Sequence, residues 1–172
     1  MNDYLTIRNA AVEQIKAGIL PLYPKMAVEP HPGLFTEQSI RRDAQRTPAI
    51  LTSLVKFTDG GQNRIVFVSW VLYRATSEDR LYDGALQIVS ALTAVIRKAD
   101  FDLVIKDTDI EAGCLFSGAL DQMNITLWAV KWELALGDHA IRETGPLDEL
   151  EYFDGTAIVG TGQIGDHANM ED

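Results

Sequence analysis

Three acidic residues at alternate positions, Asp107, Asp109 and Glu111, have the spacing best suited to chemistry in this sequence. Residues two apart share one face of a strand, so the three carboxylates could meet there. Carboxylate oxygens are the ligands that Mg²⁺ and Ca²⁺ prefer, and such a site could serve a metal-dependent enzyme. Because neither a further ligand pattern nor the glycine turn of a calcium loop follows, we favour a solvated loop over a metal site.

A glycine pattern near the C-terminus, Gly160-Thr-Gly-Gln-Ile-Gly165, matches the spacing of a dinucleotide-binding loop and follows the strand-like segment 157–159. Such a site needs a helix that begins at the loop and an acidic residue about 20 residues later. Only seven residues follow Gly165. We therefore predict a polar tail at this point and no cofactor.

The histidines and the single cysteine show no pattern of metal ligands or of a catalytic dyad. His31 lies between two prolines and His139 follows an aspartate, so we interpret both as turn residues. Cys114 lies in an apolar stretch, where we expect a small buried side chain, and one cysteine cannot form an intramolecular disulfide. No serine has the glycine-flanked pattern of a nucleophile elbow. The residues therefore predict a protein that is not an enzyme.

Two long apolar segments, 48–57 and 64–73, predict neighbouring strands, because β-branched and aromatic residues dominate both. The segment between them contains Asp-Gly, a strong hairpin signal. The second strand has apolar residues on both faces. This is typical of a strand that lies at the centre of a sheet or faces a partner subunit.

The tryptophan-rich segment 122–136 predicts the last long strand. Its expected buried face carries Trp128, Val130, Trp132, Leu134 and Leu136. The opposite face ends in Lys131 and Glu133, so we expect that end to be solvated. We expect Trp70 and the two tryptophans of this segment to lie in the core rather than at an interface.

Segments 3–20 and 77–98 predict the two main helices, since apolar residues recur in both at helical spacing. The stripe of the first consists of Leu5, Ala11, Val12, Ile15 and Ile19. The stripe of the second consists of Leu81, Ala85, Ile88, Leu92, Val95 and Ala99. Arg97 and Lys98 at the end of the second helix favour its dipole.

Shorter elements complete the prediction: strands at 26–29, 101–105 and 113–117 and a charged helix at 36–44. Together the elements predict an α+β fold, with a mixed or antiparallel sheet of about 4–5 strands flanked by two main helices. We expect one domain at residues 1–142. Residues 143–172 form an acidic, glycine-containing C-terminal arm, which we expect to be partly disordered or docked on a partner.

Charge and hydropathy exclude several classes of function. Residues 143–172 hold eight acids and no Lys or Arg, whereas residues 1–142 hold seventeen acids and fifteen bases. This balance argues against sequence-independent binding to nucleic acid, which needs a basic face. No apolar run approaches the ~20 residues that span a bilayer, and the N-terminus does not resemble a signal peptide. We therefore expect a cytoplasmic protein with no membrane partner.

Two runs, Thr47-Pro-Ala-Ile-Leu51 and Ile125-Thr-Leu-Trp-Ala-Val-Lys-Trp-Glu133, carry a resemblance to a known family. Over roughly residues 3–136 the chain resembles the tail terminator, or tail-completion, proteins of Mu-like tailed phages and their prophages. The resemblance implies an α+β fold and a homo-oligomeric ring, commonly a hexamer. Such a ring caps the tail tube, ends its polymerisation and provides the head-docking surface.

The resemblance implies three kinds of partner: further copies of the chain, the tail-tube protein and a head–tail connector protein. It places the protein in the cytoplasm of the host bacterium and in the assembled tail particle. It implies no catalytic residues and no cofactor. Two alternatives stay open: a small cytoplasmic binding or adaptor domain with no phage role, and a metal-dependent enzyme that uses the three alternating carboxylates.

A ring needs two different, complementary patches on each subunit. Arg41, Arg42 and Arg46 form a basic cluster that could be one of them. The candidate for the other is an acidic segment with aromatic residues, formed by Asp148, Glu149, Glu151, Tyr152 and Phe153. We hypothesise that this segment lies on a neighbouring subunit or on the tube; the alternative is a solvated, disordered tail.

Overall fold

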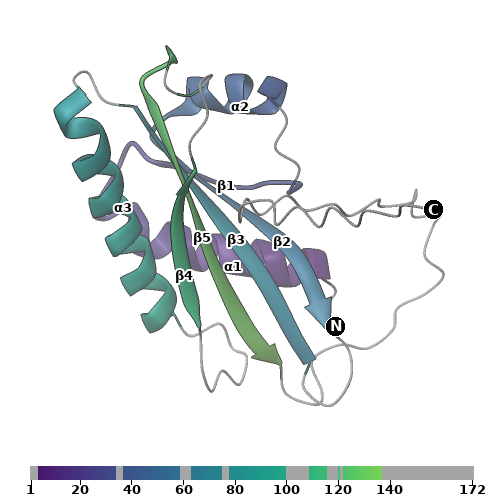
Figure 1. The fold of residues 1–172 in the computed structure, drawn as a ribbon. Coiled ribbons are helices and arrows are strands. Elements are labelled where there is room, and N and C mark those ends of the chain that lie inside the picture. The colour runs from purple at the N-terminus through teal and green to yellow at the C-terminus, as the bar shows by residue number, and fades with distance from the viewer. Residues whose placement is uncertain are drawn as a thin grey trace, which may run out of the picture.

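The sheet and its helices form the α+β fold that the sequence predicts (Figure 1). The structure, a computed structural model, describes residues 4–33, 37–58, 63–74, 78–99, 109–115, 120 and 122–136. In chain order its elements are α1 (Tyr4–Ile19), β1 (Ala27–Pro30), α2 (Glu37–Asp43), the 3₁₀ helix η1 (Ala44–Arg46), β2 (Ala49–Thr58), β3 (Asn63–Arg74), α3 (Glu78–Lys98), β4 (Ile110–Leu115) and β5 (Ile125–Leu136).

Strand β3 lies at the centre of the sheet, whose strand order is β1-β2-β3-β5-β4. β1 runs parallel to β2 and the other neighbouring pairs are antiparallel, so the sheet is mixed. Thr58 at the end of β2 pairs with Arg64 near the start of β3, which confirms the predicted hairpin. The central position explains the two apolar faces of β3, because every side chain from Ile65 to Leu72 is buried.

One face of the sheet packs against α1 and α3 (Figure 1). Phe67 of β3 and Trp132 of β5 are fully buried there, and their rings stack with centroids 4.4 Å apart. The two helices contribute Ile7, Ala11, Val12, Ile15, Ile19, Ile88, Val89, Leu92 and Ile96. Burial of one large apolar side chain stabilises a fold by roughly 1.5–3 kcal/mol, so this layer is the main core.

The predicted stripe of α1 is wrong at Leu5, which is 56% exposed. Leu5 lies in the first turn, at the margin of the buried arc, and Ile7 on the other margin is buried instead. Beside it, the ring of Tyr4 stacks on that of Phe57 near the end of β2, with centroids 4.3 Å apart. The first turn of α1 therefore contacts the sheet through an aromatic pair.

The opposite face of the sheet is apolar at one end and charged at the other. Trp70 and Leu127 lie in an apolar cluster with Ala44 of η1. Towards the other end, Arg64 Nη1 lies 3.5 Å from Glu133 Oε2. This arrangement confirms the solvated end that the sequence predicts for β5.

The three tryptophans lie in or against the core, as the sequence predicts. Trp132 and Trp70 are buried and Trp128 packs half-buried against the core.

The short elements agree with the prediction in part. The strand at 26–29 and the charged helix at 36–44 are confirmed as β1 and α2. The strand predicted at 113–117 begins earlier, at Ile110, because β4 is an outer strand and tolerates exposed residues. Segments 101–105 and 143–172 lie outside the described residues.

Candidate interaction surface around α2

The basic cluster predicted from the sequence lies on α2 and η1, which connect β1 with β2. Arg41 and Arg42 end α2 and Arg46 ends η1, and all three are exposed. A short helix that carries bases in its last turn agrees with the helix dipole. The structure therefore brings the three arginines together on one short connection, as the sequence predicts.

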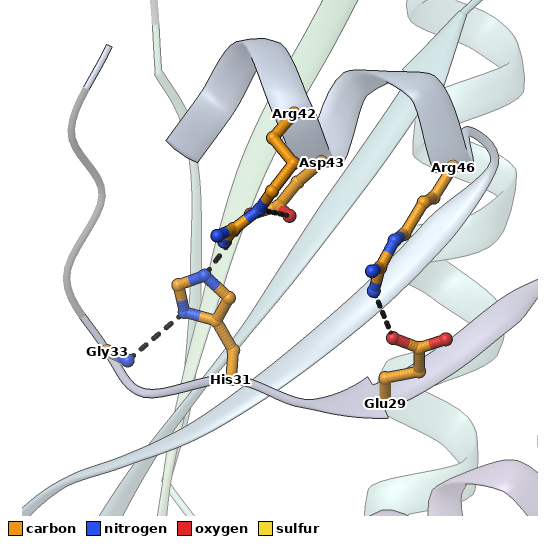
Figure 2. A network of polar contacts seen from close by, with 6 residues as sticks. All are labelled: Glu29, His31, Gly33, Arg42, Asp43 and Arg46. Atoms are coloured by element: carbon orange, nitrogen blue, oxygen red, sulfur yellow. Dashed lines mark hydrogen bonds and ion pairs between the residues drawn. The ribbon is translucent and has the colours of Figure 1, made fainter. Parts of the chain in front are cut away.

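Arg42 and Arg46 have acidic partners within the chain (Figure 2). Arg46 forms an ion pair with Glu29 of β1, and both side chains are about half exposed. Arg42 Nε lies 3.1 Å from Oδ1 of its neighbour Asp43. Exposed ion pairs contribute only about 0–1 kcal/mol. The Arg46–Glu29 pair can therefore be exchanged at little cost for a contact with acids of another molecule.

Behind this surface lies a buried contact that the sequence did not predict, between His31 and Asp43. His31 Nε2 lies 3.3 Å from Asp43 Oδ2, and both side chains are almost fully buried. The backbone N–H of Gly33 donates to His31 Nδ1 at 3.1 Å (Figure 2). A ring nitrogen that accepts a hydrogen bond carries no proton, so the proton of neutral His31 resides on Nε2 and faces the carboxylate.

Burial lowers the pKa of His31 below its ordinary value of 6.5, although the Asp43 carboxylate acts in the opposite direction. Neutral His31 thus suits both of its contacts, with Gly33 through one nitrogen and Asp43 through the other. His31 lies in the loop after β1, as the interpretation of a turn residue implies, and this loop folds its buried ring against the end of α2. Gly33, at φ +101, allows this sharp course of the backbone.

A buried His–Asp contact is also part of many catalytic sites, where the histidine acts as a general base. A general base needs a ring nitrogen that a substrate or water can reach. Here one nitrogen accepts from Gly33 and the other faces Asp43, in a side chain that is 4% exposed. The arrangement can fasten the 31–33 loop to α2, and it positions the arginines next to Asp43. The signal available in the sequence was a histidine between two prolines, just before a glycine.

The alternating carboxylates are only partly placed by the structure. Asp109 is exposed just before β4, and Glu111 is exposed within β4, where it pairs across the strands with Lys131. Asp107 lies outside the described residues. Within the part of the chain that is described, no group of three or more His, Cys, Asp or Glu residues could hold a metal ion.

The acidic half of the predicted interface falls outside the described residues. This applies to Asp148, Glu149, Glu151, Tyr152 and Phe153. The described residues therefore show the basic cluster and its internal partners but not the segment that we expect to meet it. Among the helices that are described, none combines the length and the apolar composition needed to cross a membrane.

Comparisons with known proteins add no family. No protein-family model matches the chain, and no curated protein matches it.

Proposed function

We propose that this chain is a structural assembly protein, a tail terminator that forms a ring on the end of a phage or prophage tail tube. The ring ends polymerisation of the tube and provides the surface on which the head–tail connector docks. The observation that carries the proposal is the order of elements. In chain order the structure has α1, β1, α2, the β2–β3 hairpin, α3, β4 and the tryptophan-bearing β5. The resemblance rests on a first helix, a charged segment, two long strands, a long helix and a final tryptophan-bearing strand, which correspond to all of these except β1 and β4.

The shape of the sheet supports a head-to-tail arrangement of subunits. A ring of identical subunits uses heterologous contacts, in which one side of a subunit meets a different side of the next. The two outer strands, β1 and β4, lie at opposite edges of the sheet and differ in length and neighbours. Each subunit can therefore present two unlike sides to its neighbours.

The arginine cluster supports a polar contact at one of these sides. Arg41, Arg42 and Arg46 are exposed on the connection that adjoins β1. Residues 143–172 carry eight acids and no Lys or Arg. In the proposed ring, the acidic segment with Tyr152 and Phe153 contacts the arginine cluster of the neighbouring subunit, and the Glu29–Arg46 pair opens to admit it.

Light scattering coupled to gel filtration, at low and high salt, tests the ring. We expect a mass of several subunits at low salt and a loss of that mass at high salt, because salt screens contacts between exposed charges. A chain that stays monomeric at low salt is then mixed with purified tail-tube protein, since some assembly proteins form rings only on their target.

The mixing experiment has a direct structural readout. Electron microscopy of polymerising tube protein, with and without this chain, measures tube length and the density at the tube end. Shorter tubes with a closed end support the proposal. Unchanged tubes together with a monomeric chain would overturn it and leave the adaptor domain as the function to test.

A further inference from the structure

A second feature of the surface lies away from α2, where the C-terminal halves of α1 and α3 enclose an open apolar groove of about 500 Å³. Its walls are mostly small or apolar side chains, among them Ala17, Ala91, Ala94 and Val95. Leu22 stands at its rim and is 61% exposed, the most exposed of the large apolar side chains that are described. An exposed apolar surface of this kind marks a place where another segment packs.

The groove follows from the close approach of the two helices. Gly18 of α1 lies so near Val95 of α3 that an added Cβ would stand 2.6 Å from Val95 Cγ1. Beside this contact the helices present alanines, which do not fill the space between them. The depression is therefore built into the packing of α1 on α3 and does not depend on a mobile side chain.

The charge of the groove selects the chemistry of its occupant. Lys98 is the one charged residue among those that line it, and the exposed Arg97 is next to it in sequence. The occupant should therefore combine apolar side chains with acids. Residues 147–154 have this composition: Leu147, Leu150, Tyr152 and Phe153 are interspersed with Asp148, Glu149, Glu151 and Asp154.

The position of residues 147–154 in the chain also allows them to reach the groove. β5 ends at Leu136, and the ten residues 137–146 that precede the segment can span about 33 Å when extended. In Figure 1 the C-terminal ends of β5 and α3 lie at the same end of the molecule. We propose that residues 147–154 dock in the α1–α3 groove of their own chain, with Tyr152 and Phe153 against its apolar wall and the acids near Lys98.

This docking goes beyond the proposed ring, because it concerns the chain before assembly. In the free protein the acidic segment occupies the groove and covers Leu22. In a ring, the arginine cluster of a neighbour competes for the same segment. Assembly is then coupled to release of the segment from the groove.

Hydrogen exchange measured by mass spectrometry on the full-length chain tests the docking. In the unmodified protein, amides of residues 147–154 should exchange on the order of tenfold more slowly than in an unstructured peptide of the same sequence. Ala94→Glu places a carboxylate in the groove and should bring exchange of the segment back to the peptide rate. Gln87→Glu is the matched control, because Gln87 is exposed on α3 outside the groove and receives the same side chain.

The outcomes separate the possible arrangements. Protection lost in Ala94→Glu and kept in Gln87→Glu, at every protein concentration, supports docking within the chain. Exchange at the peptide rate in the unmodified protein overturns the proposal, as does equal protection in both variants. Protection that disappears on dilution assigns the groove to the segment of a second copy and overturns docking within one chain. Each result is independent of whether the ring forms, since exchange is measured on the free protein.

Discussion

Trp132 Nε1 donates a hydrogen bond of 3.1 Å to Ser69 Oγ in a part of the core where both residues are fully buried. Ser69 Oγ also lies 2.9 Å from Thr52 Oγ1. The three residues come from β5, β3 and β2, so one polar chain joins three adjacent strands beneath the helices. A buried indole N–H needs such a partner, because an unpaired donor in the core is costly.

Ser69→Ala should destabilise the fold by about 1–3 kcal/mol, because it leaves the Trp132 N–H without its acceptor. Urea unfolding gives the free energy directly. Ser53→Ala is the control, since Ser53 is equally buried but its Oγ has no hydrogen-bond partner among the described residues. The control should be close to neutral, and an equal loss in both variants would show that the Trp132 bond does not matter.

The stability of the fold should fall as the pH drops through the range in which unfolded histidine titrates. The pKa of His31 is lower in the folded chain than its ordinary value of 6.5, so the unfolded state binds more protons between the two values. The contribution of neutral His31 is therefore complete above about pH 6.5 and is lost as the pH falls towards the folded pKa.

Thermal unfolding of the unmodified chain and of His31→Gln, between about pH 7.5 and 5.5, measures this contribution. The difference between the two isolates His31 from the other histidines and from the carboxylates. We expect the difference to shrink with falling pH. A difference that stays constant would mean that His31 does not carry the pH dependence.

Gly18→Ala should destabilise the packing of α1 on α3 by about 1–3 kcal/mol, because the new methyl group would overlap Val95. Val95→Ala in the same chain should recover part of the loss by making room. Gly113→Ala is the control, since a Cβ there meets nothing within 4 Å. Unfolding by urea measures all three, and a Gly18→Ala chain as stable as the control would contradict the close approach.

Charge reversal at Arg46 should weaken the proposed ring. In Arg46→Glu the new carboxylate stands next to Glu29 within the chain. In the ring it would also repel the acidic segment of the neighbouring subunit. Deletion of residues 145–172 should weaken assembly as well, and Arg46→Glu should add little to that deletion, because both changes remove the same contact. Light scattering measures the mass of each variant. Fully additive losses would mean that the arginine cluster and residues 145–172 do not contact each other in the ring.

The long elements were predictable because their side chains repeat with the period of the structure they form. The apolar residues on both faces of β3 indicated a strand at the centre of the sheet or against a partner subunit, and the structure shows the first. The change from Leu127 to Glu133 indicated the solvated end of β5. These signals are local, and the structure preserves them. They also indicate the fold class, since two long helices and strands joined by a hairpin favour α+β layers.

What sequence could not supply is the contact between distant segments. Periodicity placed Leu5 in the stripe of α1, but Leu5 is exposed and Ile7, on the other margin of the stripe, is buried instead. Nothing in the pattern paired His31 with Asp43, because the twelve-residue separation has no periodic meaning. The parallel pairing of β1 with β2 is of the same kind, since it is fixed by the path of the connection through α2.

The tryptophans give the protein an optical use that follows from the two-sided sheet. Trp132 is fully buried on the face covered by helices, and Trp70 lies 7% exposed on the other face. A chain that keeps Trp132 or Trp70 as its single tryptophan, with Trp128 also replaced, emits fluorescence from one layer alone. Comparing two such chains during unfolding would show whether the two layers unfold in a single event. Each tryptophan is thus an intrinsic fluorescence probe of the layer that contains it.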